Sequence, residues 1–80
     1  SMQPTIFSGN KVITKIANRG ELKEGMIVGY LDDDNNLTFH RIRAIYPMYD
    51  MVLVQGDNLE TFEEIKTDQI KYTVIGVLYT

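Results

Sequence analysis

The sequence predicts an all-β fold: a small domain of about five strands closed into part of a barrel. Two observations predict it. Short runs rich in β-branched and apolar residues recur along the chain, separated by residues typical of turns. No long stretch carries the 3.6-residue apolar period of a helix. The predicted strands span residues 11–16, 26–31, 37–46, 51–55 and 70–79.

Turn-forming residues set off the first two predicted strands. The Gly-Asn pair at 9–10 precedes the β-branched, roughly alternating segment 11–16. Residues 17–25 are polar with two glycines, which indicates a loop or a single helical turn. Residues 26–31 form an apolar run short enough for a buried strand, and the Asp-Asp-Asp-Asn-Asn segment at 32–36 predicts a hairpin loop.

The third predicted strand, 37–46, alternates clearly, so its side chains divide between two faces. One face is predicted to carry Phe39, Arg41, Arg43 and Ile45, and the other Thr38, His40, Ile42 and Ala44. Pro47 ends this strand, and 51–55 is its predicted hairpin partner. The acidic segment 59–68 has a weak helical spacing that predicts one or two turns. Gly76, inside the last strand, predicts a bulge or close packing.

Length and composition narrow the function classes. Eighty residues fit one domain, with 44% hydrophobic and 24% charged residues as in an ordinary globular protein. The net charge of −3 and the lack of a basic stripe argue against a nucleic-acid partner. Without cysteine there is no disulfide, thiolate nucleophile or cysteine zinc site, and one histidine excludes a histidine-rich metal site. We therefore expect no metal and no cofactor.

The single histidine, His40, is the first candidate for chemistry. Its reference pKa near ~6.5 suits a general base at neutral pH. A half-buried strand histidine with a backbone partner is the more common explanation of such a residue. Hydroxyl side chains are numerous, so a serine together with a histidine is not diagnostic. Taken alone, the residues predict only a small β domain.

Local motifs and their order add a resemblance. Residues 1–6, Ser-Met-Gln-Pro-Thr-Ile, resemble the Ser-Met-x-Pro-Thr box of type I signal peptidases, in which the serine is the nucleophile. Further segments resemble that family's other boxes in the same order: 21–30, 39–42 (Phe-His-Arg-Ile), 56–58 (Gly-Asp-Asn) and 74–77 (Val-Ile-Gly-Val). The chain departs from the family at Asn10 and Met26, where the family usually has aspartate.

The residue at position 40 indicates a branch of the family. Most bacterial signal peptidases have lysine immediately before the arginine of this box, whereas the archaeal and endoplasmic-reticulum enzymes have histidine. His40-Arg41 therefore resembles the Ser-His branch. The resemblance implies acyl transfer, with Ser1 as nucleophile and His40 as general base.

The resemblance also implies supporting residues. A carboxylate should orient the imidazole, with Asp57 as the first candidate and Glu63 as the second. Met2 and Pro4 are expected to help bind the substrate, a peptide or preprotein cleaved after small residues. An exposed strand edge next to a shallow pocket would bind that extended segment.

The family further implies a membrane anchor upstream of this chain, with the domain itself soluble and on the extracytoplasmic side. Two other functions stay open: a cytoplasmic self-cleaving repressor, although such proteins use a lysine base, and a non-catalytic β module, which the departures at Asn10 and Met26 favour. A Ser-Met start also arises when a tag is cleaved before an initiator methionine. The continuation at Pro4-Thr5-Ile6 and Gly9 favours a native Ser1.

Overall fold

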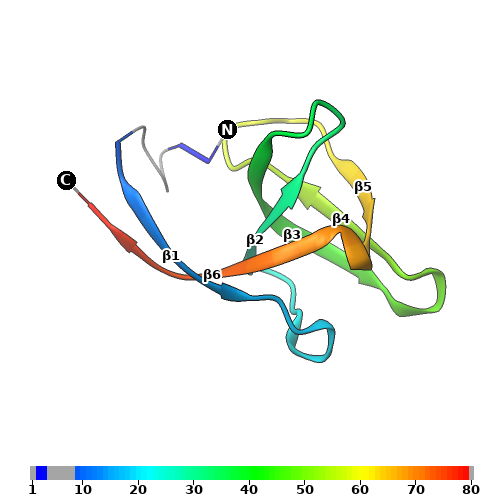
Figure 1. Cartoon of the computed structure of the whole chain (residues 1–80). Helices are drawn as coiled ribbons and strands as arrows, with labels where there is room; N and C mark the ends of the chain where they lie inside the picture. Colours follow the sequence, from blue (N-terminus) through cyan, green and yellow to red (C-terminus); the bar gives the residue numbers. More distant parts are fainter. Residues whose placement is uncertain (1, 4–8, 80) are drawn as a thin grey trace.

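The computed structural model describes residues 2–3 and 9–79, and its main feature is one antiparallel sheet of six strands (Figure 1). The all-β prediction is confirmed. The strands are β1 (Lys11–Ile16), β2 (Ile27–Leu31), β3 (Leu37–Tyr46), β4 (Met51–Gln55), β5 (Glu63–Lys66) and β6 (Ile70–Leu78). Their order across the sheet is β1-β6-β2-β3-β4-β5, so β1 and β5 are the two edges and the sheet is not closed.

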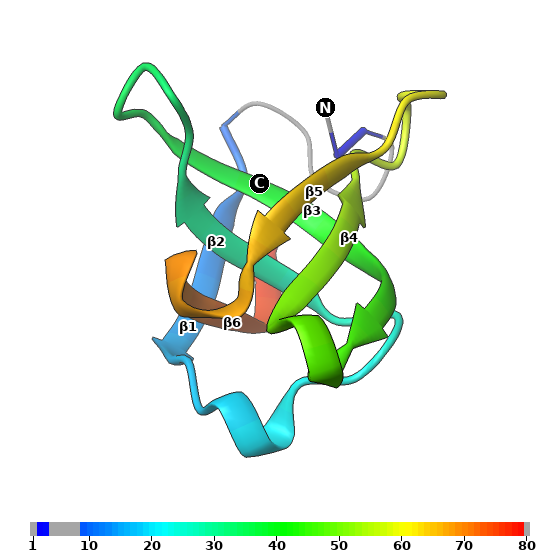
Figure 2. The same cartoon turned by 90° about the vertical axis from the view of Figure 1, so that its right-hand side faces the viewer.

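Helical structure in the described residues is limited to three single 3-10 turns: η1 (Arg19–Glu21), η2 (Pro47–Tyr49) and η3 (Thr67–Gln69). η3 leads directly from β5 into β6, which bends the sheet so that strands distant in its order approach each other (Figure 2). The resulting core contains residues from β2 to β6. Its buried members are Val28, Tyr30, Ile42, Val52, Val54, Ile65 and Ile70.

The β2–β3 hairpin forms where the turn residues predicted it. Oδ1 of Asp32 accepts hydrogen bonds from the backbone N–H groups of Asp34 and Asn36, and Asn35 takes a left-handed conformation with φ of 64°. These local bonds are the Asx-type interactions that make aspartate common in turns. They fix a register in which Val28 lies opposite His40 and Tyr30 opposite Thr38.

The segment 59–68 differs from the prediction of helical turns, because it supplies the sixth strand. Residues Glu63–Lys66 pair with β4, and only η3 is helical. Ile65 is buried opposite Val52, whereas its acidic and basic neighbours are exposed. A single buried side chain is enough to hold a four-residue edge strand, and the pairing satisfies the backbone groups along that side of β4.

Three register shifts interrupt the described sheet, one between β3 and β4, one between β1 and β6 and one between β2 and β6. In β3, Arg43 is the extra residue, because Ile42 pairs with Val54 and Ala44 with Leu53. Beyond this bulge the alternation shifts by one residue, so that Ile45 packs against the core with Ile42. The predicted faces of Ala44 and Ile45 were therefore wrong. The bulge expected in the last strand is confirmed: Ile13 pairs with Gly76 and Thr14 with Val74.

Candidate active site

Residues 2–3 lie against the body of the domain. Met2 is buried. In both views the short piece 2–3 lies beside the segment that connects β4 to β5 (Figures 1 and 2). Two predicted site residues, the nucleophile Ser1 and the substrate-binding Pro4, lie outside the described residues. Met2, the other predicted substrate-binding residue, is close-packed in the domain.

The imidazole of His40 is buried on the inward face of β3, with only 8% of the residue exposed. Its Nδ1 lies 2.9 Å from the hydroxyl oxygen of Tyr30, which is 1% exposed. The two rings meet edge to face, with centroids 5.9 Å apart and planes at 69°. The hairpin register makes them diagonal neighbours across β2 and β3, a separation that aromatic side chains span.

Glu63 is the carboxylate whose charge acts on this pair. It stands two residues before the buried Ile65, so strand alternation places it on the same face of β5, although its own side chain is exposed. Burial lowers the pKa of His40, and the negative charge of Glu63 opposes that shift. Burial also raises the pKa of the Tyr30 phenol, and Glu63 raises it further, both by its charge and by a side-chain hydrogen bond. At neutral pH the site therefore holds a neutral imidazole and a protonated phenol.

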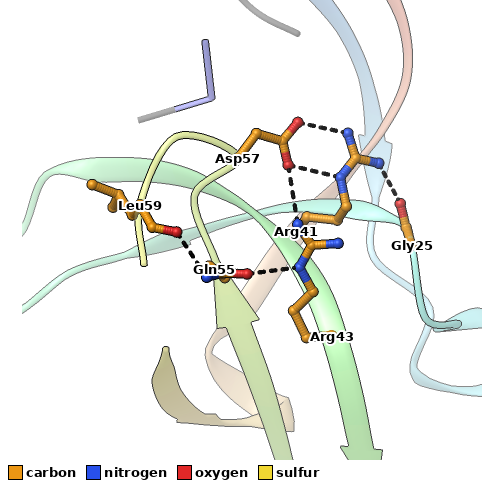
Figure 3. A network of polar contacts seen from close by, with 6 residues as sticks. All are labelled: Gly25, Arg41, Arg43, Gln55, Asp57 and Leu59. Atoms are coloured by element: carbon orange, nitrogen blue, oxygen red, sulfur yellow. Dashed lines mark hydrogen bonds and ion pairs between the residues drawn. The ribbon is translucent and has the colours of Figure 1, made fainter. Parts of the chain in front are cut away.

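Asp57, the first candidate for orienting His40, is engaged elsewhere (Figure 3). Its Oδ1 accepts from Nε of Arg41 at 2.9 Å and its Oδ2 from Nη2 at 2.8 Å, a bidentate ion pair. Nη2 of Arg43 lies 3.6 Å from Oδ1. The hydrogen bond and charge of Asp57 raise the pKa of Arg41. Arg41 also donates from Nη1 to the carbonyl oxygen of Gly25 at 2.7 Å.

Gln55 extends this network to the following loop (Figure 3). Its Oε1 accepts from Nε of Arg43 at 3.0 Å, and its Nε2 donates to the carbonyl oxygen of Leu59 at 2.7 Å. Asp57 and Gln55 thus tie the start of the β4–β5 connection to β3. The network fixes the loop beside which residues 2–3 lie.

The structure thus separates the two predicted carboxylates: Asp57 lies with Arg41 and Arg43, and Glu63 acts on His40. The sequence reasoning missed Tyr30, although a signal for it existed. A hairpin with loop 32–36 pairs residue 28 with 40, which places Tyr30 diagonally across from the histidine. No sequence signal indicated that Asp57 would accept from Arg41, because this contact depends on the path of the loop after β4.

The described residues, 2–3 and 9–79, also bear on metal binding and on membrane spanning. No group of three or more histidine, cysteine, aspartate or glutamate side chains there could hold a metal ion. Within the same part of the chain no helix has the length and apolar character needed to span a membrane. Comparisons with protein-family models, with curated proteins and with solved structures found no match for this chain.

Proposed function

We propose that this chain is the catalytic domain of a serine endopeptidase of the Ser-His type, similar to type I signal peptidases, which cleaves leader peptides after small residues. The observation that carries the proposal is the burial of His40. A general base must be neutral at working pH, and burial lowers the pKa of this imidazole. The ordered motifs of the sequence supply the second support.

In the proposed reaction, the hydroxyl oxygen of Ser1 attacks the scissile carbonyl carbon while Nε2 of His40 takes its proton. The tetrahedral intermediate collapses, the C–N bond breaks, and the imidazolium returns the proton to the leaving amine. Water then hydrolyses the ester by the same route. The mechanism requires the Ser1 oxygen within about 2.6–3.2 Å of the imidazole nitrogen.

We also propose a setting for this activity. A hydrophobic segment that precedes these residues would anchor the protein, with the domain on the extracytoplasmic side, where preproteins emerge. The substrate would bind in extended form along a sheet edge. The edge strand β5 contains Glu63, whose charge acts on the base.

The test is turnover of a fluorogenic leader peptide with Ala-x-Ala before the scissile bond. The chain is compared with its Ser1→Ala and His40→Ala variants, and with Lys15→Ala as a matched surface control. We expect each active-site substitution to lower kcat/KM by at least ~100-fold, the usual contribution of a general base, and the control to leave it unchanged. If all four proteins give the same turnover, the reaction does not depend on Ser1 or His40. That result refutes the proposal and favours a non-catalytic β module.

A further inference from the structure

We propose that Tyr30 is a positioning residue for His40: its hydroxyl accepts a hydrogen bond from Nδ1–H and so holds the imidazole in the tautomer that leaves Nε2 as the base. The contact between Tyr30 and His40 lies among the described residues, and we infer the tautomer from it together with the charge of Glu63. Its use in catalysis rests on the function proposed above, which it deepens by adding a third residue to the machinery.

The geometry of the contact between Tyr30 and His40 restricts the orientation of the imidazole. The distance of 2.9 Å between the hydroxyl oxygen and Nδ1 is that of a good hydrogen bond, and both side chains are buried. The edge-to-face packing of the rings limits rotation of the imidazole about its own axis. A buried phenol oxygen normally keeps such a partner, because leaving it unsatisfied is costly.

The negative charge of Glu63 favours one direction of this hydrogen bond. A phenol has one proton to donate, and an ionised carboxylate can only accept. Because the negative charge of Glu63 acts on the Tyr30 hydroxyl, we expect the phenol proton to point toward that carboxylate. Its oxygen is then left to accept, and the donor on the other side is Nδ1–H of His40.

This arrangement explains how a carboxylate can serve the imidazole without touching it. When Nε2 takes a proton, the imidazolium gains stabilisation from the phenol oxygen and from the negative charge of Glu63. Asp57, the other predicted carboxylate, accepts from the guanidinium of Arg41 with both of its oxygens. The orienting unit is therefore Glu63–Tyr30–His40, drawn from β5, β2 and β3.

The direct test is long-range ¹H–¹⁵N NMR of the full chain at about pH 8, where the neutral imidazole dominates. His40 is the only histidine, so its two nitrogens need no further assignment. We expect the proton on Nδ1 in the wild type. Tyr30→Phe keeps the ring but removes the acceptor, and should move the population toward Nε2–H. A urea titration of each variant confirms that it remains folded.

Glu63→Gln and Glu64→Gln form a matched pair, because neighbouring strand residues point to opposite faces. Glu63→Gln should shift the tautomer population in the same direction as Tyr30→Phe, and Glu64→Gln should leave it unchanged. A wild-type imidazole protonated on Nε2, or a population that Tyr30→Phe does not move, overturns the inference. This series remains informative if Tyr30→Phe does not fold.

Peptide turnover separates this inference from the proposed function. If both hold, Tyr30→Phe lowers kcat about 10- to 100-fold with little change in KM, a smaller loss than removing the base itself. Turnover with a wild-type Nε2–H tautomer refutes the role of Tyr30 and leaves the peptidase standing. An Nδ1–H tautomer without turnover has the opposite meaning: the Tyr30 contact is confirmed and the peptidase proposal fails.

Discussion

The Asp57→Asn substitution removes the charge that faces the guanidinium of Arg41 while keeping the size of the side chain. Arg41 then has two N–H donors aimed at a neutral amide that can accept at only one of its two terminal atoms. Arg43, 3.6 Å from the same carboxylate, loses its counter-charge as well. The consequence is a partly desolvated cation without compensation, which is more costly than the simple absence of an ion pair.

Burial sets the size of the effect. The Arg41 and Asp57 side chains are 24% and 11% exposed, so their ion pair is intermediate between exposed pairs and fully buried pairs. Exposed pairs contribute about 0–1 kcal/mol, and removing one partner of a fully buried pair costs about 3–5 kcal/mol. We therefore expect Asp57→Asn to lower the free energy of unfolding by about 2–3 kcal/mol. A chain of this length has roughly 4–12 kcal/mol in total, so the loss is large.

Urea unfolding followed by far-UV circular dichroism measures this loss. The midpoint should fall while the m-value stays constant, since the same surface is exposed on unfolding. Lys15→Gln is the control, because Lys15 and Glu21 form an ion pair of 2.7 Å whose side chains are about half exposed. That substitution should leave the midpoint unchanged.

A double-mutant cycle completes the experiment. If Arg41 and Asp57 act through each other, Arg41→Gln combined with Asp57→Asn should cost much less than the sum of the single substitutions. Additive losses, or an Asp57→Asn midpoint as high as that of the control, would refute the reasoning that Arg41 and Asp57 depend on each other for stability.

Three further outcomes follow from packing and charge. Gly29→Ala should lower the free energy of unfolding, measured with urea, by about 1–3 kcal/mol, because the added Cβ would lie 2.8 Å from Cε1 of Phe39. In a Phe39→Ala background the same substitution should not carry this clash penalty, and an unchanged penalty there would contradict the explanation. Thr73→Val should raise stability by up to about 1 kcal/mol, because this buried hydroxyl has no hydrogen-bond partner among the described residues; a loss of stability would speak against it. The fold lowers the pKa of His40 and so favours the neutral imidazole. The free energy of unfolding should therefore fall as the pH drops from the unfolded-state pKa of ~6.5 to the lower folded-state pKa. The same pH titration of His40→Gln should lack this component.

The sequence was sufficient for the elements whose patterns are strong. Residues 11–16, 37–46 and 51–55 coincide with β1, β3 and β4, because their alternation and flanking turns act locally. β5 escaped prediction because a strand with one buried residue, Ile65, has no period to detect. The bulge at Arg43 escaped as well, since it arises from the pairing of β3 with β4.

The candidate site likewise has features that local sequence patterns predict and features that depend on tertiary structure. His40 and its place on the inward face were predictable from alternation within one strand. The choice between Asp57 and Glu63 was not predictable, because each acquires its partner through tertiary structure. Asp57 meets Arg41 through the course of the loop after β4, and Glu63 reaches the site only because an unpredicted strand places it there.

The adjacent residues His40 and Arg41 show why one strand can combine a neutral base with a fixed cation. Neighbours in a strand point to opposite faces, so the guanidinium does not share the buried face of the imidazole. Arg41 is held at Gly25, just before β2, and at Asp57, just after β4. β2 and β4 are the two strands that flank β3, so these bonds fix β3 from both sides at the level of His40. A substitution at Arg41 should therefore disturb the imidazole through the backbone of β3, without any direct contact between the two side chains.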